Sequence, residues 1–116
     1  MDLYADKLNA TKQHYPFDGM RRYWQEPEER AECDALQQTF DKLITQLIAL
    51  GPDAPATKKI KCFKKAIEQT NEHEGVIETG EREDLCALTN EITLACGLNP
   101  DDYGDGEGLA SEWREW

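Results

Sequence analysis

The segment from Asp101 to Glu112 contains the residue types that come nearest to a metal site. An EF-hand calcium loop needs oxygen ligands at positions 1, 3, 5 and 12 and a glycine at position 6. Numbered from Asp101, the segment has Asp105 at position 5 followed by a glycine, and it ends on Glu112 at position 12. Position 3 is Tyr103, which carries no carboxylate, and the chain has no second loop of this kind. The pattern therefore favours a solvated acidic turn over a calcium site.

The remaining titratable residues show no catalytic pattern. Neither His14 nor His73 belongs to an H-E-x-x-H motif or lies near a C-x-x-C pair. No G-x-S-x-G motif, glycine-rich phosphate loop or kinase signature is present. Adjacent carboxylates such as Glu28 and Glu29 belong to an expected helix start, whereas acid–base catalysis needs carboxylates in a cleft with separated pKa values. The sequence predicts a protein that is not an enzyme and that uses neither a cofactor nor a metal.

Two tryptophans stand at the end of the chain. Trp113 and Trp116 are three residues apart, so a helix would place both on one face. Each indole has a large apolar surface that is unfavourable to leave in water. They either fold back to close the core or anchor a partner, as tryptophan does at interface hot spots. We favour closure of the core, and one of the two can serve both purposes.

The net charge of the chain, −11, lies entirely in residues 72–116. Residues 1–71 hold 11 acidic and 11 basic side chains, whereas residues 72–116 hold 13 acidic side chains and only Arg82 and Arg114. Net charge bears on partners and solubility rather than on the fold. The asymmetry therefore predicts a surface for a positively charged partner. It argues against direct binding of nucleic acid or of an anionic membrane, because both are negatively charged.

Lysines are concentrated in one short stretch of the otherwise acidic chain. Five of them fall within eight positions: Lys58, Lys59, Lys61, Lys64 and Lys65. No arginine or aromatic residue is interleaved as a nucleic-acid patch would require, apart from one phenylalanine. The stretch therefore predicts a solvated helix face that neutralises part of the acidic half across the fold.

Three segments with helical periodicity must position these residues. In the first, apolar residues follow one stripe: Cys33, Leu36, Phe40, Leu43, Leu47 and Leu50. Pro27 and Gly51 bound this central helix. The second helix is expected over residues 54–72 with Asp53 as its N-cap, and the third from Thr79 as N-cap to about residue 96.

The flanking segments carry weaker signals. Asp2 is a candidate cap for a short first helix, and the aromatic residues 14–26 suggest an irregular lid on the core. Residues 101–108 are expected to form a flexible acidic loop, and residues 109–116 a helical turn or two. No strand-like alternation is present. The sequence therefore predicts an all-α fold: a single domain over residues 1–116, built as a bundle of four to five helices with an acidic loop and a short C-terminal helical tail.

Composition predicts a cytoplasmic protein with a real core. The length of 116 residues fits one domain, and 39% hydrophobic residues is ordinary for a globular chain. The first residues lack the basic and apolar regions of a signal peptide, and no apolar run could span a bilayer. The four widely spaced cysteines fit buried reduced thiols better than disulfides in that compartment.

The last 40 residues carry a family resemblance. Ile-Glu-Thr at 77–79, Glu-Arg-Glu-Asp-Leu-Cys at 81–86 and Glu-Trp-Arg-Glu-Trp at 112–116 resemble small acidic bacterial immunity proteins. Such proteins are encoded beside polymorphic or secretion-delivered toxins. None of the shared motifs is catalytic. The resemblance implies a cytosolic inhibitor that binds one cognate toxin and blocks its active site.

Electrostatics agrees with this expectation, because many toxins that act on nucleic acids have a basic cleft that an acidic partner can cover with a fast on-rate. The residues expected to contact the partner are Glu81, Glu83, Asp84, Asp101, Asp102, Asp105 and Glu107, with Tyr103 and Trp113 as anchors. One alternative is a mimic of nucleic acid that inhibits a host defence nuclease, with regular carboxylates spread over an elongated surface. Others are a helical adaptor without inhibitory function and a metal sensor using the loop that begins at Asp101.

Overall fold

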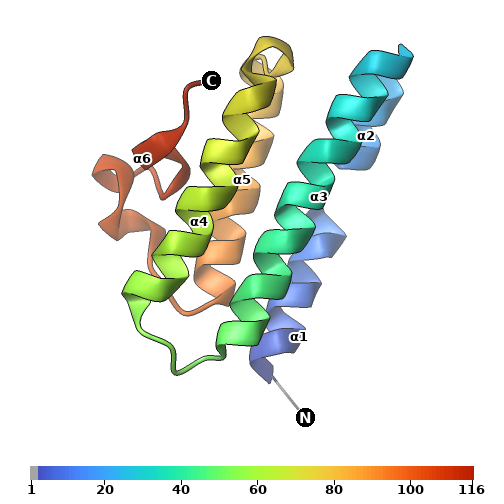
Figure 1. The fold of residues 1–116 in the computed structure, drawn as a ribbon. Helices are drawn as coiled ribbons and strands as arrows, with labels where there is room; N and C mark the ends of the chain where they lie inside the picture. Colours follow the sequence, from blue (N-terminus) through green and yellow to red (C-terminus); the bar gives the residue numbers. More distant parts are fainter. Residues whose placement is uncertain (1–2) are drawn as a thin grey trace.

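Helices account for nearly all regular structure in this computed structural model, which describes residues 3–116 and contains no strand within them (Figure 1). The α-helices are α1 (Leu3–Ala10), α2 (Phe17–Tyr23), α3 (Pro27–Leu50), α4 (Ala56–Thr70), α5 (Thr79–Ala95) and α6 (Ala110–Trp113). Short 3₁₀ helices connect them: η1 (Thr11–His14), η2 (Asn71–Val76), η3 (Pro100–Asp102) and η4 (Gly104–Gly106). The predicted all-α bundle with a short C-terminal helix is confirmed. The predicted cap at Asp2 lies outside the described residues.

The first five α-helices form an up-down-up-down arrangement, in which α1 and α2 together run in the first direction (Figure 1). α1 and α2 follow one another along α3, which runs in the opposite direction and packs against both. α4 returns along α3, and α5 runs back beside α1 and η1. The C-terminal segment, residues 98–116, packs through α6 against α4 and α5, on the side away from α2.

The predicted central helix is confirmed as α3. Its stripe is buried from Cys33 to Leu47, with Phe40 fully enclosed, as the spacing of three and four residues requires. Pro27 occupies the first turn, where its missing N–H is no loss. Gly51 ends the helix with φ of +83°, a conformation that glycine adopts without the steric penalty of a side chain.

The prediction of an irregular lid over residues 14–26 is wrong, because α2 occupies the middle of that segment. α2 buries Phe17 and Met20 in the core. Its Arg21 donates hydrogen bonds from Nε and Nη2 to Asp34 Oδ1 of α3, at 3.1 and 2.8 Å. A helix of seven residues spans only two turns, which is too short for a convincing periodicity in the sequence.

Two predicted helix starts are displaced by one or two residues. α4 begins at Ala56 after Pro55, and Asp53 forms no cap on it. Pro55 supplies an extended ψ of 146° before the first turn, so the chain enters the helix without a side-chain cap. In α5, Thr79 is the first helical residue and Glu78 is the N-cap. Shifts of this size are common at helix ends.

All four cysteines are free thiols. Cys33 and Cys96 are buried as predicted, whereas Cys62 and Cys86 are only half-buried. Burial raises the pKa of all four thiols above the ordinary value, so the thiolate is disfavoured in the folded protein. None of the helices described here has the length and apolar composition needed to cross a membrane.

Candidate binding site

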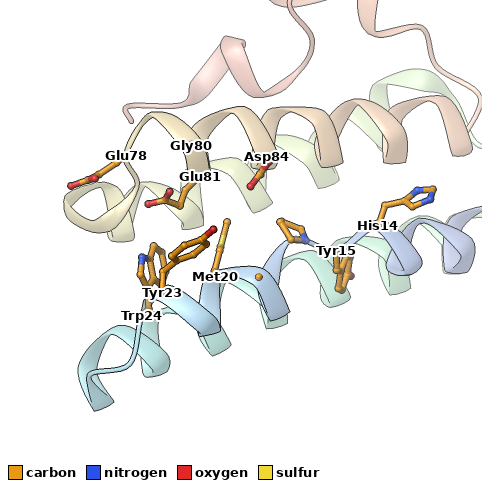
Figure 2. Close-up of a pocket in the computed structure, with 11 residues that line it drawn as sticks. His14, Tyr15, Met20, Tyr23, Trp24, Glu78, Gly80, Glu81 and Asp84 are labelled. Atoms are coloured by element: carbon orange, nitrogen blue, oxygen red, sulfur yellow. The ribbon is translucent and has the colours of Figure 1, made fainter.

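A groove with a volume of about 760 Å³ opens between α2 and the start of α5 (Figure 2). This volume lies within the range of small-ligand sites in proteins. Two contrasting walls form it, one of carboxylates at the start of α5 and one of aromatic and apolar side chains on α2 and the residues next to its two ends. The residues that line it are His14, Tyr15, Pro16, Gly19, Met20, Tyr23, Trp24, Glu78, Gly80, Glu81 and Asp84.

The carboxylate wall consists of Glu78, Glu81 and Asp84. Glu78 is the N-cap of α5, whereas Glu81 and Asp84 lie within the helix. Their spacing of three residues keeps these two side chains on one face, roughly 4.5 Å apart along the helix axis. Figure 2 shows Glu81 and Asp84 on the side of α5 that faces α2. Within residues 3–116, none of the three carboxylates belongs to an ion pair. The wall therefore presents uncompensated negative charge to the groove.

The aromatic wall consists of Tyr15, Met20, Tyr23 and Trp24. Trp24 and Met20 are buried against the core, so their positions are fixed. Tyr23, the last residue of α2, is 85% exposed, although the next residue, Trp24, is buried. A large aromatic side chain left in water at the mouth of a groove is typical of a contact residue.

His14 closes one end of the groove without neutralising its carboxylates. Its Nδ1 lies 2.8 Å from Oε1 of Glu91, which is two turns further along α5 than Asp84. No lysine or arginine lines the groove in the described part of the chain. The groove therefore combines negative charge with an aromatic surface, which is an environment that attracts an organic cation.

A second acidic surface lies on the C-terminal segment. Its carboxylates are exposed and come from Asp101, Asp102, Asp105 and Glu107, while Tyr103 and Trp113 are half-buried. The loop is held by its own hydrogen bonds, because the N–H of Gly104 donates to Glu112 Oε1 at 2.7 Å and the hydroxyl of Ser111 to Glu107 Oε2 at 3.0 Å.

These bonds bear on the calcium alternative. Glu112, which would be the ligand at position 12, already accepts the hydrogen bond from the backbone of Gly104. Nowhere in residues 3–116 do three or more His, Cys, Asp or Glu side chains gather in a way that could hold a metal ion. The geometry of the loop is that of a self-bonded turn with outward carboxylates.

The structure divides the predicted partner residues between these two surfaces. Only Glu81 and Asp84 line the groove, and Glu83 is exposed beside it without lining it. The C-terminal segment contacts another face of α5, where Asn90 Nδ2 donates to the backbone oxygen of Glu107 at 3.2 Å. Six residues of helix separate Asp84 from Asn90 and turn the two side chains about 120° apart.

Sequence reasoning missed most of the groove. Glu78 on the carboxylate wall and all of the aromatic wall were absent from the predicted partner residues. The one available signal was the run of aromatic residues between His14 and Glu26, which is unusual on a surface element. That signal does not reveal that α5 lies opposite.

The two C-terminal tryptophans have different environments. Trp116 is buried, and its Nε1 donates to the hydroxyl of Thr70 at 3.0 Å. Trp113 is half-buried and leaves part of its ring accessible. The prediction of core closure is confirmed for Trp116, and Trp113 retains accessible surface for a partner.

Tyr15, on the aromatic wall, makes the stability of the fold depend on pH. Its hydroxyl donates to Asp41 Oδ1 at 2.8 Å, and burial, this bond and the charge of Asp41 raise the pKa of the phenol well above its ordinary value. The hydrogen-bonded Tyr15 phenol stabilises the folded state fully at pH values below the unfolded-state pKa of about 10. Above that pH this contribution to the free energy of unfolding is lost progressively, because the unfolded state releases the phenol proton and the folded state keeps it. Tyr15→Phe should lower the free energy of unfolding by about 1 kcal/mol at neutral pH. The difference between wild type and variant should shrink above pH 10, measured by urea unfolding.

The exposed Tyr23 provides the control for that measurement. Tyr23 is 85% exposed, so Tyr23→Phe removes a hydroxyl group from a side chain in water. The difference in stability between this variant and wild type should stay near zero both at neutral pH and above pH 10. A constant difference for Tyr15→Phe across the same pH range would show that the Tyr15 phenol titrates normally.

Comparison with known proteins adds no relative. No protein-family model matches this chain, and neither a curated protein nor a solved structure was found to be similar to it. The fold and the site therefore define the class by themselves: a helical bundle with two acidic surfaces, one of them a groove with an aromatic wall.

Proposed function

We propose that this chain is an immunity protein that binds one cognate bacterial toxin in the cytoplasm and inhibits it by covering a basic active-site cleft. The observation that carries the proposal is the charge separation, since the whole net charge of −11 belongs to residues 72–116. These residues supply the carboxylate wall of the groove and the exposed carboxylates of the C-terminal segment. A basic cleft would meet both with complementary charge.

The sequence predicted a flexible loop in the C-terminal segment, but hydrogen bonds hold this loop in place, and its order supports the proposal. Its loop is held by hydrogen bonds from Gly104 to Glu112 and from Ser111 to Glu107, and its end is held by Asn71 of η2. A surface that is already ordered loses little conformational entropy when it binds. The exposed carboxylates are therefore preorganised for a partner, and the accessible parts of Tyr103 and Trp113 can supply apolar contact beside them.

Capture of the partner tests the proposal directly. The tagged chain is used as bait in its native host, and bound proteins are identified by mass spectrometry. A stoichiometric basic enzyme whose activity disappears on binding is the expected result. A defence or restriction nuclease in its place would favour the nucleic-acid mimic, and a partner whose activity is unchanged would favour the adaptor.

Charge reversal on the C-terminal segment is expected to weaken the complex strongly. Asp101→Lys, Asp102→Lys and Asp105→Lys together should reduce affinity about 100-fold, since each exposed pair contributes on the order of 1 kcal/mol and like charges then repel. Most of the loss should appear as slower association at low salt, measured by surface plasmon resonance.

A matched triple variant controls for net charge. Asp6→Lys, Glu28→Lys and Glu68→Lys change the same number of exposed carboxylates on α1, α3 and α4. This control should lose far less affinity than the first triple variant. Equal losses in the two would show that only the overall charge matters, and an unchanged affinity in the first would remove the C-terminal segment from the interface.

A further inference from the structure

We infer that the groove between α2 and α5 binds an arginine side chain of the partner, with the guanidinium group stacked on Tyr23 and paired with the carboxylates of Glu81 and Asp84. The inference rests on the proposed function in one respect, namely that the arginine belongs to the inhibited toxin. The groove itself is defined by its own geometry and can be tested without the toxin.

The charge of the groove selects a cation. Glu81 and Asp84 lie on one face of α5, and Glu78 is its N-cap. None of the three carboxylates has an ion-pair partner in the described residues, and the imidazole of His14 is engaged with Glu91 instead. An anionic ligand would be repelled, and an apolar ligand would desolvate the carboxylates without replacing their hydrogen bonds. A metal ion is disfavoured because, among the described residues, no three His, Cys, Asp or Glu side chains are arranged so that they could hold one.

The aromatic wall selects arginine among the cationic side chains. A guanidinium group is planar, stacks on an aromatic face and forms two parallel hydrogen bonds to a carboxylate. The ammonium group of lysine is compact and strongly hydrated, and it cannot form this flat double contact. Tyr23 is 85% exposed and stands at the mouth of the groove opposite Glu81, so its ring is available for stacking (Figure 2).

The groove is also preorganised, so it needs little rearrangement to bind such a ligand. Trp24 and Met20 are less than 10% exposed and fix the back of the aromatic wall. Glu81 and Asp84 belong to the first turns of a 17-residue helix, so their backbone positions are fixed as well. Only the outer side chains need to adjust, which keeps the entropic cost of binding low.

The test uses the full chain and short peptides with blocked termini. One peptide alternates three arginines with glycines, a second replaces each arginine by lysine, and a third replaces each by citrulline, the neutral analogue of arginine. Binding is measured by calorimetry, and the contact site is mapped by NMR chemical shifts. We expect saturable binding of the arginine peptide with shifts at Tyr23 and Trp24, at least about fivefold weaker binding of the lysine peptide, and none of the citrulline peptide.

Variants on both walls then locate the interaction. Glu81→Gln and Tyr23→Ala should each weaken binding of the arginine peptide about fivefold to tenfold, because each removes one of the two selective contacts. Both residues are at the surface of the groove, so the variants should fold, and circular dichroism checks this. The matched control is Glu68→Gln, which removes one exposed carboxylate from α4, outside the groove.

Three outcomes would overturn the inference: equal affinity for the arginine and lysine peptides, equal losses in Glu81→Gln and Glu68→Gln, or chemical shifts confined to the C-terminal segment. Failure of the groove is distinguishable from failure of the proposed function. Capture of an inhibited toxin without arginine binding would overturn only the groove. Arginine binding that depends on Tyr23 and Glu81, found with a partner that is not inhibited, would support the groove and overturn the immunity function.

Discussion

Trp116→Ala is expected to lower the free energy of unfolding by about 3–4 kcal/mol, the usual loss when a buried tryptophan is truncated. Trp116 is only 6% exposed and is enclosed at the end of a segment that packs on α4 and α5. Its Nε1 donates to Thr70 Oγ1, so the variant loses a buried hydrogen bond as well as apolar contact. Urea unfolding followed by circular dichroism measures the change.

The other contacts that hold the C-terminal tail do not depend on the side chain of Trp116. Asn71 Nδ2 donates to the backbone oxygen of Trp113 at 3.0 Å, and its Oδ1 accepts from the N–H of Glu115 at 2.9 Å. These bonds involve the backbone of the tail, so Glu115→Ala keeps them and should change stability by less than about 0.5 kcal/mol. Trp116→Phe should fall between the two. A loss below about 1 kcal/mol in Trp116→Ala would mean that the tail does not close the core.

The long helices were accessible from the sequence because their signal is local. In α3, seven buried positions recur at helical spacing between Cys33 and Leu47, and proline and glycine mark its two ends. The short α2 lacks such a signal, since two turns give too few repeats and its stability comes from contacts with α3, such as Arg21 with Asp34. Tertiary packing of this kind overrides a weak local preference.

The candidate site was accessible only in part, for a related reason. The acidic first turns of α5 are visible in the sequence, and so are Glu81 and Asp84 on one helical face. The wall opposite them comes from Tyr23 and Trp24, about 60 residues earlier in the chain, and nothing in the local pattern brings the two together. The acidic residues therefore appeared as one surface, whereas the structure places them on two, the groove and the C-terminal segment.

The acidic loop illustrates the same limit at shorter range. Its glycines indicate a turn, and Gly104, Gly106 and Gly108 all have positive φ. Asp105 shares that conformation at φ of +55°, which aspartate tolerates better than most residues. Gly108 also lies so close to Asn90 that a side chain there would clash with it. The turn was predictable from composition, but its attachment to α5 depends on this close approach.

The predicted solvated lysine face is wrong at one position, Lys59, although Lys58, Lys61, Lys64 and Lys65 are exposed. Lys59 is 5% exposed, and its Nζ donates to the backbone oxygens of Pro52 at 3.0 Å and Cys96 at 2.8 Å. The same Nζ lies 5.2 Å from the centre of the Tyr4 ring, a cation–π contact. Lys59 thereby connects the turn before α4, the end of α5 and α1.

The position of Lys59 explains why a buried cation is tolerated there. Cys96 is the C-cap of α5, where the helix dipole is negative and the last carbonyl groups lack partners within the helix. The ammonium group satisfies one of these carbonyls and one in the turn at the same time. Lys59→Ala should therefore lower the free energy of unfolding by about 2–3 kcal/mol, since hydrogen bonds to a charged donor are lost and two carbonyls lose their partner.

Two further variants separate charge from packing at Lys59. Lys59→Met keeps most of the aliphatic stem but removes the donor, so it should lose most of the same stability if the hydrogen bonds dominate. Lys58→Ala, one residue away on the exposed face of α4, should change stability by less than about 0.5 kcal/mol. If Lys59→Met were as stable as wild type, the stem rather than the ammonium group would hold the three elements together. Lys59 contacts the C-terminal end of α5, whereas the groove lies at the N-terminal end of the same helix. Loss of the Lys59 contact should therefore leave the groove intact, and binding of the arginine peptide to the folded Lys59→Ala protein should be unchanged.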